Sequence, residues 1–205
     1  MTRKNYRGPL KKSALYEQAV WIYYAFLADY LNLNKTPSSG LEKRRLVLNI
    51  AKSKNFNNFV ETGTYLGEMV NEIKDKFKKV YSIEIDKKLY SKAKRRFKKY
   101  KHIRIVKGDS CERLAKIINK LEGPTIYWLD AHYSGGITSF GNRQTPVRGE
   151  LSEILQNWKK DSIILIDDAR RFNGKKGYPS LQEIGKIAEK NNLKVLIAHD
   201  VIQIS

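Results

Sequence analysis

The sequence has a single cysteine, Cys111, among its 205 residues. One cysteine can form neither an internal disulfide nor a cysteine-based zinc cluster, so both kinds of structural cross-link are excluded. Long apolar runs are also absent, because no stretch reaches the roughly eighteen residues that a transmembrane helix requires. The nearest approach, residues 19–28, is short, is flanked by Glu17 and Asp29, and has no small-x-small cleavage site behind it. We therefore expect a cytoplasmic protein, either free or peripheral to a membrane.

Acidic residues are scarce. The chain has 21 Asp and Glu against 40 Lys and Arg, which leaves a formal net charge of +19. A charge of this size attracts nucleic acid, anionic membranes or acidic substrates, but it carries no information about the fold. Hydrophobic residues make up 41% of the chain and aromatic residues 11%, which indicates a globular protein. The length suits one domain with an N-terminal appendage.

From residue 57 onward, short apolar runs alternate with helical periodicity, which is typical of βαβ units and a parallel sheet. Seven strands are expected, at residues 58–62, 80–85, 103–107, 125–130, 162–167, 194–199 and 201–204. The last two strands are separated by Asp200 alone, so they can pair only in antiparallel fashion. The sequence therefore predicts an α/β fold with a mostly parallel, Rossmann-like sheet of seven strands that closes with a C-terminal antiparallel hairpin.

Residues 1–54 are predicted to be a basic N-terminal tail and a helical appendage, and residues 55–205 to form the main domain. The segment 13–33 is apolar around almost its whole circumference, and such a helix needs cover on more than one side. A second copy of the chain is the most common cover, so we expect a homodimer through residues 13–33. Attachment to a membrane surface is the alternative, because basic residues precede the segment.

Two buried strands end in carboxylates. The predicted fourth strand runs into Asp130 and His132, and the fifth ends in Asp167 and Asp168. Because the carboxyl ends of parallel strands meet at one edge of a sheet, where ligands bind, these side chains should converge. Oxygen ligands of this kind suit Mg²⁺ better than Zn²⁺, and the imidazole supplies a base beside them. The alternative is that Asp167 caps the next segment and Asp130 begins a turn.

A glycine-containing turn follows the first strand, in the segment Glu61-Thr62-Gly63-Thr64-Tyr65-Leu66-Gly67. Glycines here allow the backbone to approach a ligand, and the helix that follows presents unpaired N–H groups. Near the end of the second strand, Glu84 can accept both ribose hydroxyls of a nucleoside cofactor. Asp109 and Ser110 follow the third strand and place another acid beside an adenine-sized slot. Helix N-capping is the alternative for each acid, but their order along the chain favours a nucleoside cofactor.

In these features, over roughly residues 55–205, the chain resembles the class I S-adenosylmethionine-dependent methyltransferases. The resemblance implies S-adenosylmethionine as cofactor, with Gly63 and nearby backbone at its methionine part, Glu84 at its ribose, and Asp109 and Ser110 at its adenine. Tyr65 departs from the family pattern, since many members have glycine there. The cofactor-binding set that we expect is Glu61, Gly63, Thr64, Tyr65, Gly67, Glu84, Asp109, Ser110 and Asp130.

The acids after the fourth and fifth strands are similar to those of the metal-dependent, macrocin-type sugar O-methyltransferases. That resemblance implies that Asp130, Asp167 and Asp168 bind Mg²⁺, which chelates two neighbouring substrate hydroxyls, with Asp130 and Asp168 also in the catalytic set. The base falls on His132, where many relatives have Asp. Metal coordination lowers the pKa of a sugar hydroxyl, and the base removes its proton. The predicted function is methyl transfer to a hydroxyl of a glycan or a glycosylated small molecule.

Residues 87–107 contain eleven Lys or Arg and no acid. They form either a solvated helix face or a surface for RNA or anionic lipid. The charge favours a nucleic-acid methyltransferase as a second candidate function. Against it, the fourth strand lacks the Asn/Asp-Pro-Pro-aromatic ending of base-amine methylators, and the fifth lacks the terminal lysine of ribose 2′-O methylators. A non-catalytic nucleoside-binding module at an anionic surface is the third candidate.

Overall fold

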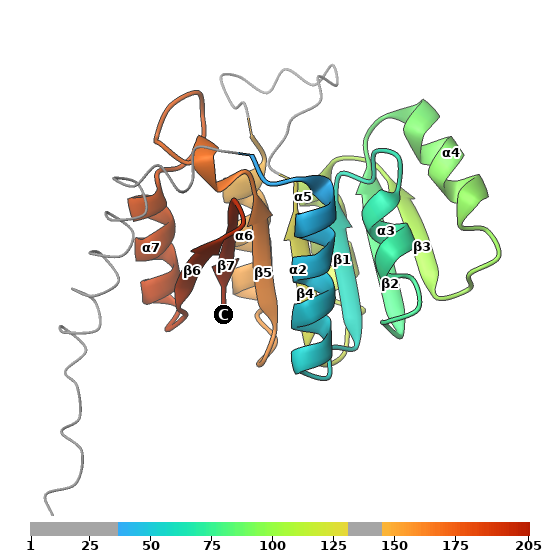
Figure 1. The fold of residues 1–205 in the computed structure, drawn as a ribbon, viewed down its shortest axis with the longest axis horizontal. Helices are drawn as coiled ribbons and strands as arrows, with labels where there is room; N and C mark the ends of the chain where they lie inside the picture. Colours follow the sequence, from blue (N-terminus) through green and yellow to red (C-terminus); the bar gives the residue numbers. More distant parts are fainter. Residues whose placement is uncertain (1–36, 131–144) are drawn as a thin grey trace, which may run out of the picture.

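The computed structural model describes residues 37–130 and 145–205. Its strands are β1 Asn58–Thr62, β2 Lys79–Glu84, β3 Ile103–Lys107, β4 Thr125–Leu129, β5 Ile163–Asp167, β6 Val195–Ala198 and β7 Val201–Ile204. They form a seven-stranded sheet in the order β3-β2-β1-β4-β5-β7-β6 (Figure 1). The strands β1 to β5 are parallel, whereas β7 runs antiparallel to both β5 and β6. The predicted fold class, including the terminal hairpin, is confirmed.

Helices cover both faces of the sheet. The chain has α2 Gly40–Ser53, α3 Glu68–Ile73, α4 Lys87–Arg96, α5 Ser110–Ile118, α6 Val147–Gln156, α7 Leu181–Lys190 and a short 3₁₀ helix, η1 Ala169–Arg171. Buried side chains of α2, α3 and α4 belong to one hydrophobic cluster, and those of α5, α6 and α7 belong to the other. The two clusters lie on opposite faces, so the domain has three layers (Figure 1).

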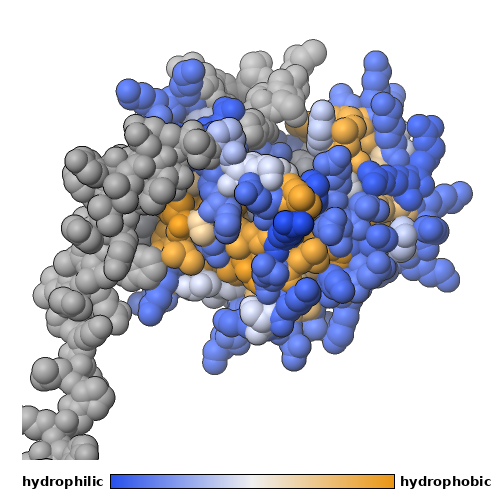
Figure 2. Space-filling view, viewed as in Figure 1, coloured by the Kyte–Doolittle hydropathy of each residue, from blue (hydrophilic) through white to orange (hydrophobic). Residues whose placement is uncertain are grey.

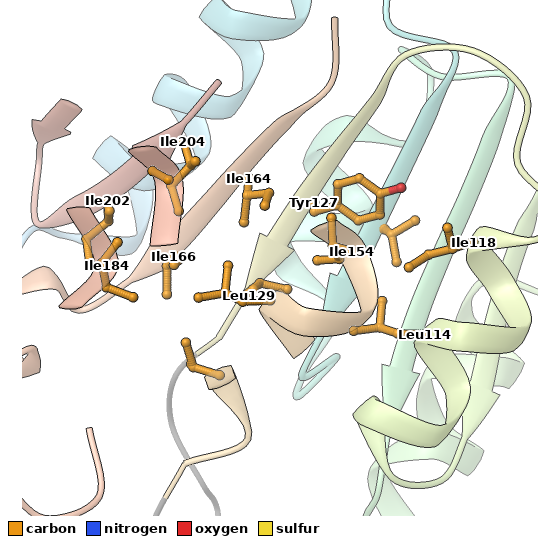
Figure 3. Packing of buried hydrophobic residues seen from close by; sticks show 14 of the residues in the cluster. Leu114, Ile118, Tyr127, Leu129, Ile154, Ile164, Ile166, Ile184, Ile202 and Ile204 are labelled. Carbon is orange, nitrogen blue, oxygen red and sulfur yellow. The ribbon is translucent and has the colours of Figure 1, made fainter. Parts of the chain in front are cut away.

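Alternation along the strands builds these two clusters. In β5, Ile164 and Ile166 join the cluster under α5, α6 and α7, whereas Ile163 and Leu165 join the cluster under α2, α3 and α4. Figure 3 shows the first cluster, in which strand side chains meet Ile154 of α6. Every residue of β1, β4 and β5 is buried. Strands β4 and β5 are therefore nearly continuous apolar runs followed by polar groups, whereas β1 contains the buried polar residues Asn58, Glu61 and Thr62.

Helix α2 precedes the first strand and packs on the sheet. Ser39 and Glu42 form a capping box at its start, with the Ser39 hydroxyl accepting from the Glu42 N–H and the Glu42 carboxylate accepting from the Ser39 N–H. Val47 is fully buried in the cluster shared with α3 and α4. This packing brings the first turn of α2, which carries Lys43, to the carboxyl end of the sheet, where its ammonium contacts Asp167.

The hairpin between β6 and β7 turns through two residues. His199 and Asp200 have φ values of 54° and 58°, as a type I′ turn requires. Asp200 is buried, and its backbone and carboxylate both accept hydrogen bonds from the segment that follows β5. The hairpin therefore supports the end of β5, where the acidic pair lies.

Two sequence predictions concern residues outside the described ranges, namely the docking segment 13–33 and the base His132. Both stay predictions. Within residues 37–130 and 145–205, none of the helices combines the length and the apolar character needed to cross a membrane.

Candidate active site

The loop after β1 contains two glycines whose backbone conformation lets the chain turn tightly and pass close to its neighbours. Gly63 and Gly67 have φ values of 89° and 74°, in the left-handed region that favours glycine. A Cβ on Gly67 would lie 2.7 Å from the Phe97 ring at the end of α4, so this glycine lets the loop pack against that helix. Tyr65, between them, also has a positive φ, of 48°. The backbone is thus strained at Tyr65, the position where many class I methyltransferases have glycine.

Glu84 ties this loop to the second strand. Its Oε2 accepts from the Tyr65 N–H at 2.8 Å, and its Oε1 accepts from the Asp86 N–H at 2.9 Å. The side chain is 4% exposed, so both bonds lie in a mostly dry environment. Each carboxylate oxygen keeps a second lone pair, so the group can still accept hydroxyl donors. Glu84 therefore holds the loop and keeps lone pairs for further donors.

Glu61 lies on the same sheet face as Glu84, in a buried chain of hydroxyls. The Ser82 hydroxyl donates to Glu61 Oε2 at 2.5 Å, and the Thr64 and Ser82 hydroxyls are 2.6 Å apart. Burial raises the pKa of Glu61 to about 8, the charges of Asp130 and Glu84 add to the rise, and the Ser82 hydrogen bond opposes it. Glu61 and Thr64 are thus buried, and Ser82 links them by hydrogen bonds beside the loop after β1.

Replacing Glu61 by Gln should make folding less dependent on pH. Between its ordinary pKa of 4.5 and the folded value of about 8, the folded state keeps a proton that the unfolded chain releases. Stability therefore falls as pH rises through this range, and Glu61→Gln should remove about 3 kcal/mol of that cost near neutral pH. Urea unfolding at pH 5 and pH 8 measures it, with the exposed Glu122→Gln as the matched control. If the free energy of unfolding changes equally between pH 5 and pH 8 in wild type and Glu61→Gln, burial does not raise the pKa of Glu61.

Asp109 caps the helix that follows β3. Its Oδ1 accepts from the Cys111 N–H at 2.9 Å and the Glu112 N–H at 3.3 Å. The capping alternative raised for this acid is thus realised, as it is for Asp86 at the start of α4. Capping uses Oδ1 and leaves the other carboxylate oxygen, together with Ser110, at the carboxyl end of β3.

Glu150 is a buried carboxyl to which sequence analysis gave no role. It lies in the first turn of α6 and is fully buried, on the same helix face as Val147, Leu151 and Ile154. Burial raises the pKa of Glu150 to about 7, the hydroxyls of Ser110 and Thr62 oppose the rise, and the charges of Asp109 and Asp130 add to it. The sequence did contain a sign of this burial, because Glu150 lies four residues before Ile154 and so falls within the apolar stripe of the helix.

Asp130 lies directly against the glycine loop. A Cβ on Gly63 would stand 3.1 Å from the Asp130 Cβ and 3.3 Å from its Oδ2, and the Asp130 N–H donates to the Thr62 carbonyl at 3.2 Å. Strand β4 pairs with both β1 and β5, so Asp130, at its carboxyl end, stands between the ends of these two strands. The structure therefore places Asp130 between the loop and the acidic pair.

The acidic pair after β5 lies within a cluster of cations. The Lys43 ammonium of α2 forms ion pairs with Asp167 Oδ1 and, at 3.3 Å, with Asp168 Oδ1. Asp168 is 1% exposed and has a φ of 59°, and it also pairs with Arg170 Nη1 at 2.7 Å and Arg171 Nε at 3.1 Å. Burial raises the pKa of Asp167, while Lys43 lowers it. Arg170 additionally pairs with the buried Asp200.

This arrangement does not fit a magnesium ion held by all three predicted ligands. Lys43 already bridges Asp167 and Asp168, and two arginines share the second of these carboxylates. In the part of the chain that the structure describes, no three His, Cys, Asp or Glu side chains group closely enough to hold a metal ion. A divalent cation would have to displace the Lys43 ammonium before it could bind the pair.

Comparisons with known proteins place this geometry in context. No protein-family model and no curated protein matches the sequence. Among solved structures, the SAH-bound methyltransferase PaMTH1 from Podospora anserina is 16% identical, with a TM-score of 0.55 and coverage of 97% of this chain and 98% of that chain. A candidate caffeoyl-CoA O-methyltransferase from Staphylococcus aureus is also 16% identical, with a TM-score of 0.51 and coverage of 93% and 96%. This chain has the class I methyltransferase fold.

The N-methyltransferase NodS from Bradyrhizobium japonicum has the same fold. It is 14% identical, with a TM-score of 0.52, and the match covers 80% of this chain and 92% of that chain. Because these proteins methylate different kinds of atom according to their names, the shared fold does not select an acceptor.

Proposed function

We propose that the protein is an S-adenosylmethionine-dependent O-methyltransferase that acts on a hydroxyl of a glycan or a glycosylated small molecule. The observation that carries the proposal is the contact between Asp130 and Gly63, since it joins the acidic rim to the loop that would hold the cofactor. A methyl donor and an acceptor hydroxyl must meet within reach of one another, and this is where they would do so.

The described residues fit the proposed cofactor. Gly63 lets the loop backbone pass close to Asp130, Glu84 has lone pairs for two ribose hydroxyls, and Asp109 with Ser110 would border the adenine side. When bound, S-adenosylmethionine would supply a methyl group already activated at its sulfonium. The chain then has to hold the acceptor oxygen in line and accept its proton.

The proton acceptor and the metal are finer parts of the proposal. His132, two residues after Asp130, is the predicted base, since an imidazole titrates near neutral pH. Mg²⁺ dependence is carried over from the macrocin-type resemblance. The ion pairs that Lys43 forms with Asp167 and Asp168 oppose metal binding in the described arrangement.

A methyl-transfer screen tests the function. Full-length protein is incubated with cofactor labelled in its methyl group, over glycan, glycosylated small-molecule and RNA acceptors, with and without Mg²⁺. We expect label on a glycan hydroxyl. As a test variant, Asp130→Asn keeps the side-chain volume beside Gly63 and should lose transfer, with a much smaller loss of cofactor affinity because the other predicted cofactor contacts remain.

The other outcomes decide between the alternatives. Label on RNA alone would establish the nucleic-acid methyltransferase that the charge of +19 favours. Binding of S-adenosylhomocysteine without transfer to any acceptor would indicate the non-catalytic nucleoside-binding module. Wild-type turnover in Asp130→Asn would remove Asp130 from the acceptor side of the site.

A further inference from the structure

The largest feature that the proposed function leaves unused is a basic surface at one end of the sheet. We define it as the eleven Lys and Arg side chains of residues 87–107, which occupy α4, the turn after it and the edge strand β3. All eleven are exposed. Figure 2 shows hydrophilic side chains projecting from the side of the molecule where Figure 1 places α4.

The described residues form no ion pair with the basic surface. Among the described residues, none of the salt bridges involves a cation of this segment. The nearby acid, Asp86, uses its carboxylate to cap α4 by accepting from the Lys88 and Leu89 N–H groups. Like charges at this density repel one another, so a polyanion is the partner that would relieve the repulsion.

The surface curves around the sheet edge. On the α4 side, Ala93 and Phe97 bury the apolar stripe of the helix against the sheet, and Ile103 and Ile105 of β3 face the same cluster. Arg104 lies between them on an edge strand, so its side chain leaves on the opposite face of the sheet. One cation, Arg104, therefore lies on the far side of the edge from α4. A flat bilayer can touch only one side, whereas a flexible strand of phosphates can follow the curve.

The apolar groups of α4 also argue against lipid. An interfacial helix buries its apolar face in the membrane, but here that face packs on the sheet through Ala93 and Phe97. The exposed aromatic ring nearby is Tyr65, at 64% exposure, and the next residue, Leu66, accepts from Arg96 Nη1 at 2.6 Å. An exposed ring beside a basic track suits base stacking on single-stranded nucleic acid.

We propose that the basic surface binds single-stranded RNA through its phosphates, with Tyr65 at the end of the track nearest the cofactor loop. The inference does not rest on methyl transfer, because binding needs neither cofactor nor turnover. Several phosphates would be contacted at once, so the affinity should fall steeply with salt, by about 0.7 in log affinity per log salt for each phosphate neutralised.

Fluorescence anisotropy of the full chain with a labelled oligouridylate of about 20 nucleotides tests the proposal. The test variant changes four exposed cations that make no side-chain contact in the structure: Lys92→Gln, Arg95→Gln, Lys98→Gln and Lys101→Gln. The control removes the same charge from the other end of the sheet: Lys175→Gln, Lys176→Gln, Lys186→Gln and Lys190→Gln. We expect the test variant to bind about tenfold more weakly and to lose about 2 to 3 from the salt slope, with a much smaller change in the control.

Two results would overturn the proposal. Equal losses in the two variants would mean that RNA responds to net charge and not to this surface. Binding to phosphatidylserine vesicles that is lost in the test variant, without RNA binding by wild type, would replace RNA with a membrane. Circular dichroism of both variants verifies that α4 and the fold are intact, since none of the changed side chains is buried.

Discussion

Glu84→Ala should weaken binding of S-adenosylhomocysteine by about 100-fold or more. Hydrogen bonds to a charged group are worth about 1.5–3 kcal/mol each, and the ribose would lose two acceptors. The same carboxylate accepts from the Tyr65 N–H at 2.8 Å, so the variant also releases the loop at its strained residue. Isothermal titration calorimetry with full-length protein measures the loss directly.

Two further variants separate the ribose from the loop. Glu84→Gln keeps one carbonyl acceptor but turns an amide donor toward a backbone N–H, so it should lose most of the affinity. Tyr65→Gly keeps the backbone N–H that Glu84 accepts, relieves the positive φ of 48° and removes only a ring that is 64% exposed. If Tyr65 serves the cofactor through its backbone, this variant should bind about as well as wild type. Unchanged affinity in a folded Glu84→Ala protein would show that the ribose assignment is wrong.

The strands and the hairpin were predictable because their signals are local. Strands β4 and β5 are buried on both faces, so their apolar runs are continuous and end where the polar site begins. In the sequence only Asp200 separates the last two predicted strands, so they can be joined only by a tight antiparallel turn. In the structure His199 and Asp200 form that turn. The convergence of the acids at the ends of β4 and β5 was also predictable, because the carboxyl ends of parallel strands lie at one edge of the sheet.

The partners of those acids were not predictable. Lys43 reaches Asp168 across 125 residues of sequence, and a lysine on an amphipathic helix gives no sign that it will meet a carboxylate. Asp200 and Arg170 meet only because the hairpin folds back beside β5. Cofactor loops carry strong local patterns, whereas the charge balance of a site depends on long-range packing. The sequence therefore indicated a cation site here but could not show that the chain supplies the cation itself.

Lys43→Met should raise the affinity of the protein for a divalent cation by about tenfold or more. In wild type the Lys43 ammonium bridges Asp167 and Asp168, so any metal ion must displace it. At the effective dielectric of a partly buried site, one unit charge at about 4 Å contributes on the order of 4 kcal/mol, and the 11% exposure of the Lys43 side chain reduces that figure by screening. Methionine keeps the length of the side chain and removes the competing charge.

Binding of Mn²⁺, followed by electron paramagnetic resonance, measures this competition. Asp168→Asn in the Lys43→Met background should abolish the gained affinity, because it removes a carboxylate that is 1% exposed and central to the cluster. Asp168→Asn alone should cost about 3–5 kcal/mol of stability, since Lys43, Arg170 and Arg171 all lose an ionic partner. The matched control is Lys52→Met, an exposed lysine in the last turn of the same helix. If Lys43→Met and Lys52→Met bind Mn²⁺ equally, the lysine does not compete with metal for the pair. Turnover of the same variants in chelator then shows which cation, ammonium or Mg²⁺, serves the reaction.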